Sequence, residues 1–498
     1  MTQPPSDQPE QHLAGADVLA AEPAVSARGR RRGVLIGASV LAVALVGGGA
    51  ALAASKLGGG GAQPDEVVPA SAVGFFAVDL DPSAGQKVDF LRFARKFPDA
   101  RKAIGSDDDV RKALFEALKK DGQIKGDWSS DVAPWLGDRA GFAVLPPQAD
   151  GDDPGAVVVL AVTDADKAKA GIAKVSEGQA KCEFPDGWAV CSDDAAVVSK
   201  AVKDAADKPL SQAKDYTADV DALGERGIAR AWFDLGKLQE AVPTSGAQLS
   251  AALSSAKLTG RTAFALRFDG PTLELTGQAT GTQLPKLTGT AGVDDLPASS
   301  VAVYGFSGAD RLVDYAYAQV RKAAESMNGV EQLDAATRQV QQQFGISVPG
   351  DVTRAIGDRM ALVYGGTDDG APKVAARFSG DRGTLDKIVN AVQGGTGLTL
   401  GKAQSGSDTV LASSQAYADE VATQHGLGGA PAFKDAVPDA KDAQGVLYVD
   451  VASALAQVGD QAELSATERE QLKVLRAFGL TVTQDGDRLS YDARLTTK

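Results

Sequence analysis

The chain is poor in the residues that most often carry metal, redox and nucleophilic chemistry. Its 498 residues include two histidines, two cysteines and three methionines. His425 is the only histidine after residue 60, and we interpret it as a partner of a helix dipole at a helix end. The sequence contains no G-x-S-x-G or H-E-x-x-H motif and no complete S-x-x-K set. These absences argue against serine hydrolases and zinc enzymes, and we predict no cofactor, no metal and no catalytic residue.

Composition and charge exclude further classes of protein. Hydrophobic residues make up 44% of the chain and charged residues 23%, which is typical of a folded protein rather than a disordered one. The net charge of −14 repels phosphate backbones, so we predict no nucleic-acid partner. Carboxylates are plentiful, and a pair of them acting as acid and base stays open as an alternative.

A basic cluster followed by a long uncharged run predicts a membrane anchor. Arg28, Arg30, Arg31 and Arg32 precede residues 33–55, which carry no charge. As a helix, this run spans about 34 Å, enough to cross a hydrocarbon core about 30 Å thick. Because basic residues stay on the cytoplasmic side, we expect a single-pass protein of the cell membrane with its N-terminus in the cytoplasm. Cleavage after Ala51-Leu52-Ala53 and secretion is the alternative.

The anchor divides the chain into parts of different character. We expect residues 1–32 to form a disordered cytoplasmic tail, residues 33–55 to contact the lipid bilayer, and residues 56–64 to form a Gly-rich tether. The charges of the tail sum to zero, so the whole net charge of −14 belongs to the extracytoplasmic part.

Segments of the extracytoplasmic part recur in the same order. Residues 68–76 are similar to residues 296–304 at an offset of 228, and residues 229–234 to the segment ending at Asp450 at an offset of 216. A third match, at an offset of 220, relates Asp131, Gly137, Asp138 and Arg139 to Asp351, Gly357, Asp358 and Arg359. Small drifts in offset indicate two copies of one unit, which we place at residues 65–285 and 290–498. We interpret Gly137 and Gly357 as left-handed helix ends that lead into strands.

Hydrophobic periodicity predicts the same plan for both copies: an opening strand, helices, a strand pair, a further helix and a closing hairpin. Near the C-terminus, we expect a helix that begins at Ser465 and stops at Gly479. In the closing hairpin of the first copy, Leu273 and Leu275 alternate with Thr272 and Glu274, which predicts one solvated face. Because hairpins dominate, the fold class is α+β, with mostly antiparallel sheets and helices packed against one face.

The two cysteines flank a predicted hairpin. A two-residue turn at Asp186-Gly187 places Cys182 opposite Cys191 in a non-hydrogen-bonded pair, whose Cα atoms lie about 4.5 Å apart. Outside the cytoplasm, such a pair oxidises to a disulfide. A type I turn with Gly187 as a bulge would shift the register by one residue and prevent the bond, so both registers stay open.

Tryptophans and acidic runs are the remaining candidates for binding residues. We interpret Trp128, Trp135, Trp188 and Trp232 as core or sheet residues rather than a platform for sugars. The acidic runs at 107–109, 150–153 and 368–369 lack the spacing of a calcium loop and are typical of helix starts and turns, with cation binding as the alternative.

Two motifs resemble a known family. Residues 68–80 (VPASAVGFFAVDL) and 135–144 (WLGDRAGFAV), preceded by a basic tail and one apolar span, are similar to bacterial membrane-anchored proteins with the domain of unknown function 3352. The resemblance covers most of residues 65–498 and implies a location in the cell envelope. It implies no activity, cofactor or catalytic residue.

Together these features favour a binding protein over an enzyme. We expect a non-enzymatic binding or scaffold module of the cell envelope, with an envelope protein or wall component as its partner. A carboxylate-based envelope hydrolase, with its site in or between the copies, is the alternative. A deep cleft with two carboxylates of raised pKa would favour the hydrolase, and an exposed apolar patch would favour binding.

Overall fold

The computed structural model describes residues 61–79, 83–98, 100–101, 110–120, 122, 124–149, 153–241, 259–282, 284–368, 370–458 and 465–498. The expected tail, the expected membrane span and residues 56–60 of the tether lie outside these residues, as does the acidic run at 107–109. Among the described residues, no helix combines the length and the apolar character needed to cross a membrane.

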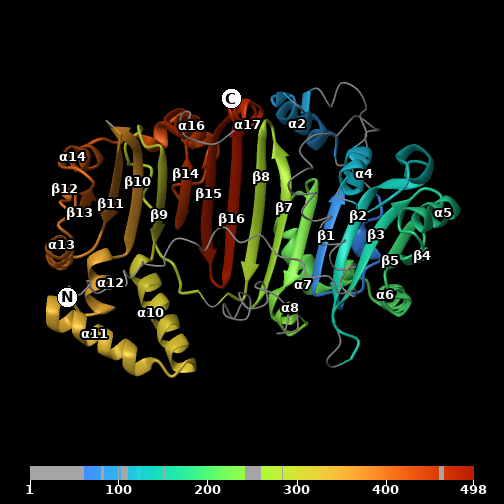
Figure 1. The fold of residues 1–498 in the computed structure, drawn as a ribbon, viewed down its shortest axis with the longest axis horizontal. Coiled ribbons are helices and arrows are strands. Elements are labelled where there is room, and N and C mark those ends of the chain that lie inside the picture. The colour runs from blue at the N-terminus through green and yellow to red at the C-terminus, as the bar shows by residue number, and fades with distance from the viewer. Residues whose placement is uncertain are drawn as a thin grey trace, which may run out of the picture.

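The described strands form one sixteen-stranded sheet in which every neighbouring pair is antiparallel (Figure 1). The first half of the chain contributes β1 (Gly74–Asp79), β2 (Leu136–Leu145), β3 (Gly155–Val162), β4 (Lys181–Glu183), β5 (Trp188–Ser192), β6 (Ala229–Asp234), β7 (Arg261–Asp269) and β8 (Thr272–Thr280). The second half contributes β9 (Ala302–Ser307), β10 (Arg359–Asp368), β11 (Ala371–Phe378), β12 (Gly401–Ser405), β13 (Asp408–Ala412), β14 (Gly445–Val449), β15 (Leu475–Asp485) and β16 (Arg488–Thr497). An α+β fold built on a large antiparallel sheet is therefore confirmed.

Both halves order their strands in the same way. From its outer edge to the centre, the first half reads β4-β5-β3-β2-β1-β6-β7-β8, and the second reads β12-β13-β11-β10-β9-β14-β15-β16. The halves join where β8 pairs with β16, from Leu273 opposite Leu495 to Ala279 opposite Leu489. We call this pairing the seam. Because it is an ordinary antiparallel ladder, the sheet continues through the centre of the molecule without a break.

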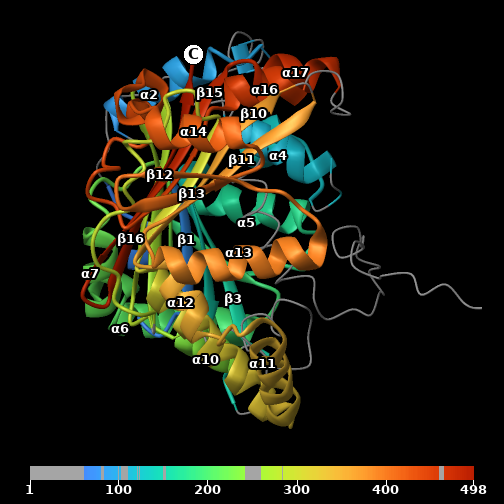
Figure 2. The same ribbon diagram turned by 90° about the vertical axis from the view of Figure 1, so that its left-hand side faces the viewer.

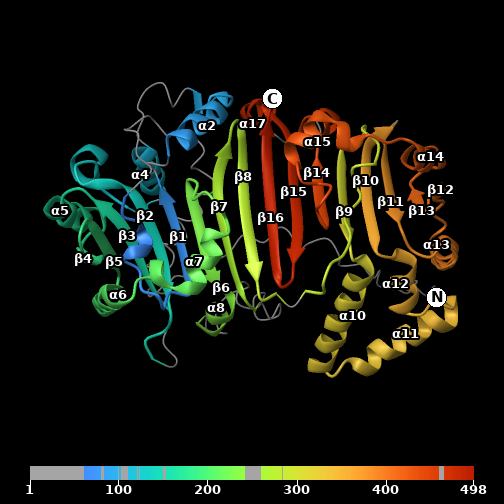
Figure 3. The ribbon, with the colours of Figure 1, turned by 180° about the vertical axis from the view of Figure 1, so that it is seen from behind.

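Helices pack on both faces of the sheet rather than on one, and Figure 2 shows them on either side. Figure 3 shows the molecule from behind, with the face that we call the inner face toward the viewer. The inner face carries α6 (Ala195–Asp207), α7 (Lys214–Asp221), α14 (Gln415–Thr423) and α15 (Pro431–Ala436). The outer face carries helices of the first half, α2 (Ala84–Ala94), α4 (Val110–Lys120) and α5 (Ala165–Val175), and of the second half, α10 (Ala309–Ser326), α11 (Val330–Phe344), α12 (Gly350–Ile356), α13 (Arg382–Thr396) and α16 (Val451–Val458). Two short helices, α8 (Leu235–Ala241) and α17 (Ala466–Leu472), precede β7 and β15.

The inner face holds one aromatic core in each half. In the first half, the ring of Tyr216 on α7 lies 5.8 Å from that of Phe75 on β1 and 5.7 Å from that of Trp232 on β6. In the second half, Phe433 on α15 lies 5.0 Å from Tyr448 on β14. Edge-on ring pairs of this kind add to the stabilisation from burial itself.

The polar side of β8 is its buried side, so the expectation of a solvated polar face was wrong. Thr272 and Glu274 are buried, whereas Leu273 and Leu275 are only half-buried. The reason is tertiary: Arg267 and Arg494 from the neighbouring strands bind Glu274, so the polar side of β8 packs on the inner face. Alternation in the sequence shows that the two sides differ but not which of them meets solvent.

The expected helix from Ser465 to Gly479 is shorter than predicted. Ser465 and Glu468 form the capping box as expected, but α17 ends at Leu472 and β15 begins at Leu475. Gly479 lies inside β15, where a side chain would meet the carbonyl oxygen of Ala436 at 2.2 Å. Its role is close approach between strand and helix rather than helix termination.

Gly137 was also misassigned as a helix end. It lies within β2, and it does not share the positive φ of Gly357, which follows α12 with φ 74° and ψ −165°. A Cβ atom at Gly137 would lie 2.8 Å from that of Ala161, and one at Gly357 would lie 2.4 Å from the nitrogen of Gly380. Gly137 therefore permits close contact with β3, and Gly357 with the segment that follows β11.

Two helical glycines are expected to respond in opposite ways to alanine. At Gly171 in α5, a Cβ atom would lie 2.2 Å from both the Asp131 carbonyl oxygen and Trp135 Nε1, which are hydrogen-bonded to each other. Gly171→Ala should therefore lower the free energy of unfolding by about 3 kcal/mol. At Gly394 in α13 nothing lies within 4 Å, so Gly394→Ala should raise it by about 1 kcal/mol. Urea unfolding measures both, and a stable Gly171→Ala variant would contradict this packing.

Candidate functional site: the outer face and the seam

The outer face of the sheet carries no charge across most of its width. Residues that pair directly across neighbouring strands share a face. One such row is Leu160, Ala140, Val78, Ala229, Leu266, Leu275, Ala493, Leu480, Leu447, Tyr304, Leu362, Ala376 and Leu411. The adjacent row is Val158, Phe142, Phe76, Ala231, Phe264, Gly277, Tyr491, Val482, Gly445, Phe306, Met360 and Phe378. In water, an apolar face of this size is expected to be covered by other elements of the chain or by a partner.

The two halves differ in how far this face is covered. In the second half, Tyr304 is 48% exposed, Leu362 40% and Val374 45%. The residues at offsets of 228 and 220 in the first half are Phe76 and Phe142, which are 3% and 8% exposed. We call Tyr304, Leu362 and Val374, on the neighbouring strands β9, β10 and β11, the exposed strip. It is an apolar surface that the described chain leaves open.

Two amphipathic helices of the same half also lack a buried side. Ala309 is the only buried residue described in α10, and α11 has none. Val320, Met327 and Phe344 are exposed on or beside this pair, which lies below the ends of the strands of the second half in Figure 1. Thr353 Oγ1 on α12 donates to Asp314 on α10 at 2.8 Å, and Arg321 on α10 pairs with Asp334 on α11 at 2.8 Å. These polar contacts link α10 to α12 and to α11.

A charged cluster lies at the seam on the inner face. Glu274 on β8 accepts hydrogen bonds from Arg267 on β7 and from Arg494 on β16, the latter at 3.0 Å. Arg494 also pairs with Asp269, at 2.5 Å. Asp492 lies two residues before Arg494, opposite Thr276. The cluster thus joins three strands across the junction of the two halves.

The two carboxyl groups of this cluster, buried Glu274 and half-buried Asp492, have different affinities for protons. Burial raises the pKa of Asp492 to about 7, and its hydrogen bond with Glu274 and the charge of Glu274 act in the same direction. Burial also opposes ionisation of Glu274, but hydrogen bonds from Arg267 and Asp492 hold the pKa of Glu274 below its usual value. Near neutral pH, the pair is therefore one carboxylate and one partly protonated acid.

Asp492 and Glu274 have the chemistry of an acid and a base, but neither of the two cavities described next lies beside them. A cavity of about 200 Å³ lies between the β2–β3 turn and α6, lined by Pro69, Pro146, Pro147 and Val197. A smaller hollow lies beside Pro64 and Arg226. Catalysis needs a substrate within hydrogen-bond reach of the acid. The seam cluster is instead arranged to join β8 to β16.

Asp131 and Asp351 hold the same contacts in the two halves. Asp131 accepts from the backbone nitrogen of Asp127 at 2.8 Å and from Lys174 Nζ at 2.7 Å. Asp351 accepts from the backbone nitrogen of Ser347 at 2.9 Å and from Lys387 Nζ at 3.3 Å. The Lys174 hydrogen bond, with that of Asp127, lowers the pKa of Asp131 to about 2. Each aspartate fastens a turn to the following helix.

The repeated Asp-Arg pairs contact other elements rather than each other. Arg139 Nε binds Asp79 on β1 at 2.9 Å, and Arg359 binds Asp408 on β13 at 3.3 Å. Asp138 lies 3.3 Å from Arg111 on α4, and Asp358 lies 3.8 Å from Arg311 on α10. These contacts tie strands and helices together at the start of β2 and β10.

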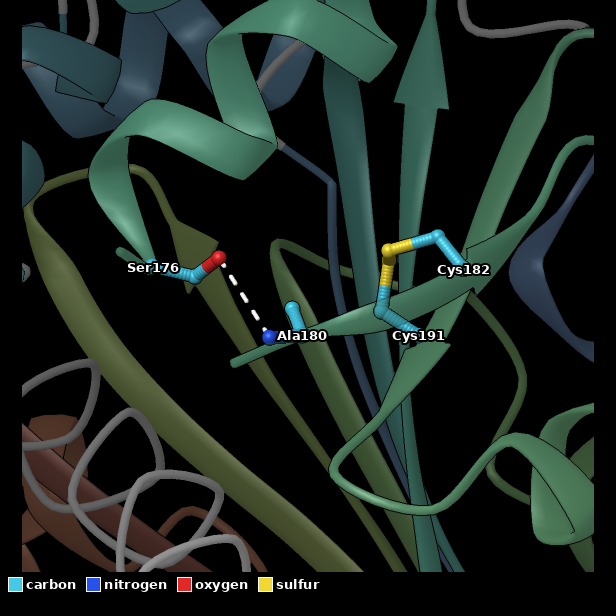
Figure 4. Close-up of a disulfide and its surroundings, with 4 residues drawn as sticks. All are labelled: Ser176, Ala180, Cys182 and Cys191. Atoms are coloured by element: carbon cyan, nitrogen blue, oxygen red, sulfur yellow. Dashed lines mark hydrogen bonds between the residues drawn. A yellow bond between two sulfur atoms is a disulfide. The ribbon is translucent and has the colours of Figure 1, made fainter. Parts of the chain in front are cut away.

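The predicted disulfide is present. Cys182 on β4 lies opposite Cys191 on β5, and the two are bonded with their Cα atoms 4.2 Å apart (Figure 4). The alternative register, shifted by a bulge, does not occur. Just before β4, the backbone nitrogen of Ala180 donates to Ser176 Oγ at the end of α5 (Figure 4). Both cysteines pack in the cluster under α5, which gives the bond a structural setting.

The other sequence candidates are placed as follows. All four tryptophans are buried, as predicted. His425 is exposed just after α14, and its Nδ1 lies 2.8 Å from the carbonyl oxygen of Asp295. Within the described ranges, no group of three or more His, Cys, Asp or Glu side chains is placed to hold a metal ion. Arg28, Arg30, Arg31 and Arg32 lie outside the described residues.

The sequence reasoning missed the exposed strip, although a signal was present. Residues 301–306 form an almost continuous apolar run, whereas a strand with one solvated face alternates. Such a run predicts a strand whose two faces both need cover.

Comparison with known proteins identifies part of the chain. Residues 34–185 match the family model described as protein of unknown function (DUF3352). This segment includes both motifs, 68–80 and 135–144, so the resemblance is confirmed there. No curated protein and no solved structure matches the chain.

Proposed function

Starting from the family match over residues 34–185, we propose that the protein is a single-pass, membrane-anchored extracytoplasmic binding protein without enzymatic activity. Its binding surface is the exposed strip on the second half of the sheet. The basic cluster before residue 33 and the uncharged run 33–55 support the anchor and its orientation. The disulfide supports an oxidising compartment.

We further propose that the two halves are copies of one ancestral unit. Their strand orders are the same, and Asp131 and Asp351 make the same contacts in each. Isolated bridges also recur, between Pro69 and Pro209 and between Pro297 and Gly426. In this view, the sheet arose when the last strands of the two copies paired at the seam.

The observation that supports a binding function is the difference in exposure between equivalent positions of the two halves. Phe76 and Phe142 are buried in the first half, whereas Tyr304 and Leu362 are open in the second. Exposing large apolar side chains costs stability, so a surface that keeps them is typical of an interaction site. A wall glycan needs several hydrogen-bonding groups, whereas the side chains of the strip offer it the Tyr304 hydroxyl alone. We therefore favour a hydrophobic partner.

A photoreactive residue tests this proposal in intact cells. The full chain with a benzophenone amino acid at position 304 should give a cross-linked adduct of one discrete mass. Val88 on α2 is 47% exposed but lies outside the strip, so the same substitution there should give no such adduct. Equal labelling from both positions, or no adduct from position 304, would reject the strip as the binding surface.

A hydrolase at the seam is the less favoured alternative. The raised pKa of Asp492 beside Glu274 fits an acid–base pair. Both carboxyl groups, however, lie among Arg267 and Arg494 in a sheet that is continuous. Neither cavity described above reaches them.

A further inference from the structure

We infer that the cavity beside α6 in the first half binds one aromatic ring of about the size of phenol. The cavity lies between α6 and the β2–β3 turn, on the inner face, whereas the exposed strip lies on the outer face of the second half. It is therefore a second site, beyond the proposed function and independent of it. The class of ligand is indicated by what the second half places at the equivalent position.

The helices that border this position correspond to each other in the two halves. α6 and α14 begin after equivalent residues, Asp194 and Ser414, whose side chains accept hydrogen bonds from the first turn. With this offset of 220, Val197 on α6 corresponds to Tyr417 on α14. Because α6 packs against β3 and α14 against β11, each the third strand from its outer edge, the two residues occupy the same place in their halves.

The strands beneath the helices correspond as well. Val158 on β3 and the residue 218 positions later on β11 pair with residues of β2 and β10 that are 220 positions apart. At the same offset of 218, Gly155 corresponds to Lys373. At the offset of 220, Leu145 corresponds to Gly365.

In the second half, an aromatic ring fills this position. Tyr417 is 2% exposed, and Lys373 Nζ lies 4.7 Å from the centre of its ring. Lys373 also pairs with Glu420 at 2.6 Å. Gly365 provides space for the phenol group, because a Cβ atom there would lie 2.6 Å from the Tyr417 hydroxyl oxygen. The fold therefore accepts a phenol ring between this helix and this pair of strands.

In the first half, the same position is partly empty. Val197 and Gly155 are smaller than the tyrosine and the lysine of the second half, and Leu145 restores only part of the lost volume, since a cavity of about 200 Å³ remains. Its apolar lining consists of Pro69, Leu145, Pro146, Pro147, Val197 and Ala201. An apolar molecule that enters the cavity removes its own surface and that of these walls from water.

The volume of the cavity limits the ligand to a single ring. An apolar cavity of about 150 Å³ binds benzene, whereas pockets for drug-sized ligands begin at about 300 Å³. A sugar ring would leave hydroxyl groups without partners against the apolar walls. Lys200 and Asp204, which pair at 2.5 Å and are partly exposed, also line the cavity. A hydroxyl substituent on an aromatic ring would find hydrogen-bonding partners in this pair.

Photolabelling with 4-azidophenol tests the inference. The full chain is reconstituted into phosphatidylcholine vesicles and illuminated with the probe, and adducts are mapped by mass spectrometry. We expect adducts on peptides that contain 145–149 and 195–204, and their loss in an excess of p-cresol. Peptides that contain 365–368 and 415–424 serve as an internal control and should stay unlabelled, because Tyr417 already fills the equivalent position.

Substitutions that copy the second half should close the cavity. Val197→Tyr, and independently Gly155→Lys, should reduce the adducts of the first half about tenfold, because each inserts a side chain into the space of the ring. Ala196→Tyr adds the same ring at the adjacent, exposed residue and should leave the labelling unchanged. The urea midpoint of each variant checks that it folds.

Competition identifies the source of the ring. If N-acetyltyrosine amide competes as well as p-cresol, the cavity accepts a tyrosine side chain of a polypeptide; if p-cresol alone competes, the ligand is a free aromatic compound. Equal labelling of the two halves, adducts that p-cresol does not remove, or adducts insensitive to both Val197→Tyr and Gly155→Lys overturn the inference. None of these results bears on cross-linking from position 304, which tests the exposed strip.

Discussion

Replacing Asp65 with alanine is expected to lower the free energy of unfolding by about 3–5 kcal/mol. Asp65 is 5% exposed and Arg230 is 4% exposed, so the variant would leave an arginine buried without its counter-charge. Asp65 Oδ2 also accepts the hydroxyl of Tyr216 at 2.7 Å, and this bond would be lost too. The loss should appear as a lower urea midpoint with an unchanged slope.

The second half of the chain supplies the design of a rescue. At offsets of 228 and 216 from Asp65 and Arg230 stand Val293 and Val446, both buried in the core of the second half. Replacing a buried ion pair by apolar side chains is often neutral or stabilising. The double variant Asp65→Val with Arg230→Val should therefore recover most of the stability that Asp65→Ala loses.

A surface ion pair provides the matched control for this experiment. Glu470 pairs with Lys473 at 2.6 Å, but both side chains are exposed. Glu470→Ala should change the free energy of unfolding by less than about 0.5 kcal/mol. If Asp65→Ala were as mild as this control, the buried pair of Asp65 and Arg230 would not stabilise the fold.

Local features of the fold were accessible from the sequence because they depend on neighbouring residues. The capping box of Ser465 and Glu468 and the pairing of Cys182 with Cys191 both follow from spacings of a few residues. The helix expected to reach Gly479 failed because local periodicity does not reveal that α15 packs against β15 there.

Features that depend on contacts between distant segments were not accessible. Glu274 and Arg494 are 220 residues apart, and only the seam brings them together. Likewise, Phe76 and Tyr304 occupy matching strands of similar sequence, yet one is buried and the other open. A repeat in the sequence predicts that the two strands are similar. The exposure of their side chains, however, depends on which elements pack over each strand. The candidate surface therefore emerged only from the structure.

The seam cluster is expected to make stability depend on pH. Because burial raises the pKa of Asp492 to about 7, the folded protein holds a proton that the unfolded chain releases near pH 4. The contribution of Asp492 is fully present below about pH 4 and is lost as the pH rises through about 7. After allowance for partial solvent screening, the loss is about 2 kcal/mol. Glu274, with its lowered pKa, loses its own contribution only as the pH falls below its ordinary value of 4.5.

Asp492→Asn isolates this effect, because the amide still donates a hydrogen bond to Glu274 but does not ionise. The variant should match the wild-type stability near pH 4 and exceed it by about 2 kcal/mol above pH 7. Urea unfolding of both proteins from pH 4 to 8 measures the difference. Ser490→Asn introduces the same amide two residues away on the same face of β16, so its difference from wild type should not vary with pH. If the difference in unfolding free energy between Asp492→Asn and wild type were also independent of pH, Asp492 would not share a proton with Glu274 in the folded protein. In that case, the protonation of Asp492 would not contribute to the stability of the junction between the two halves.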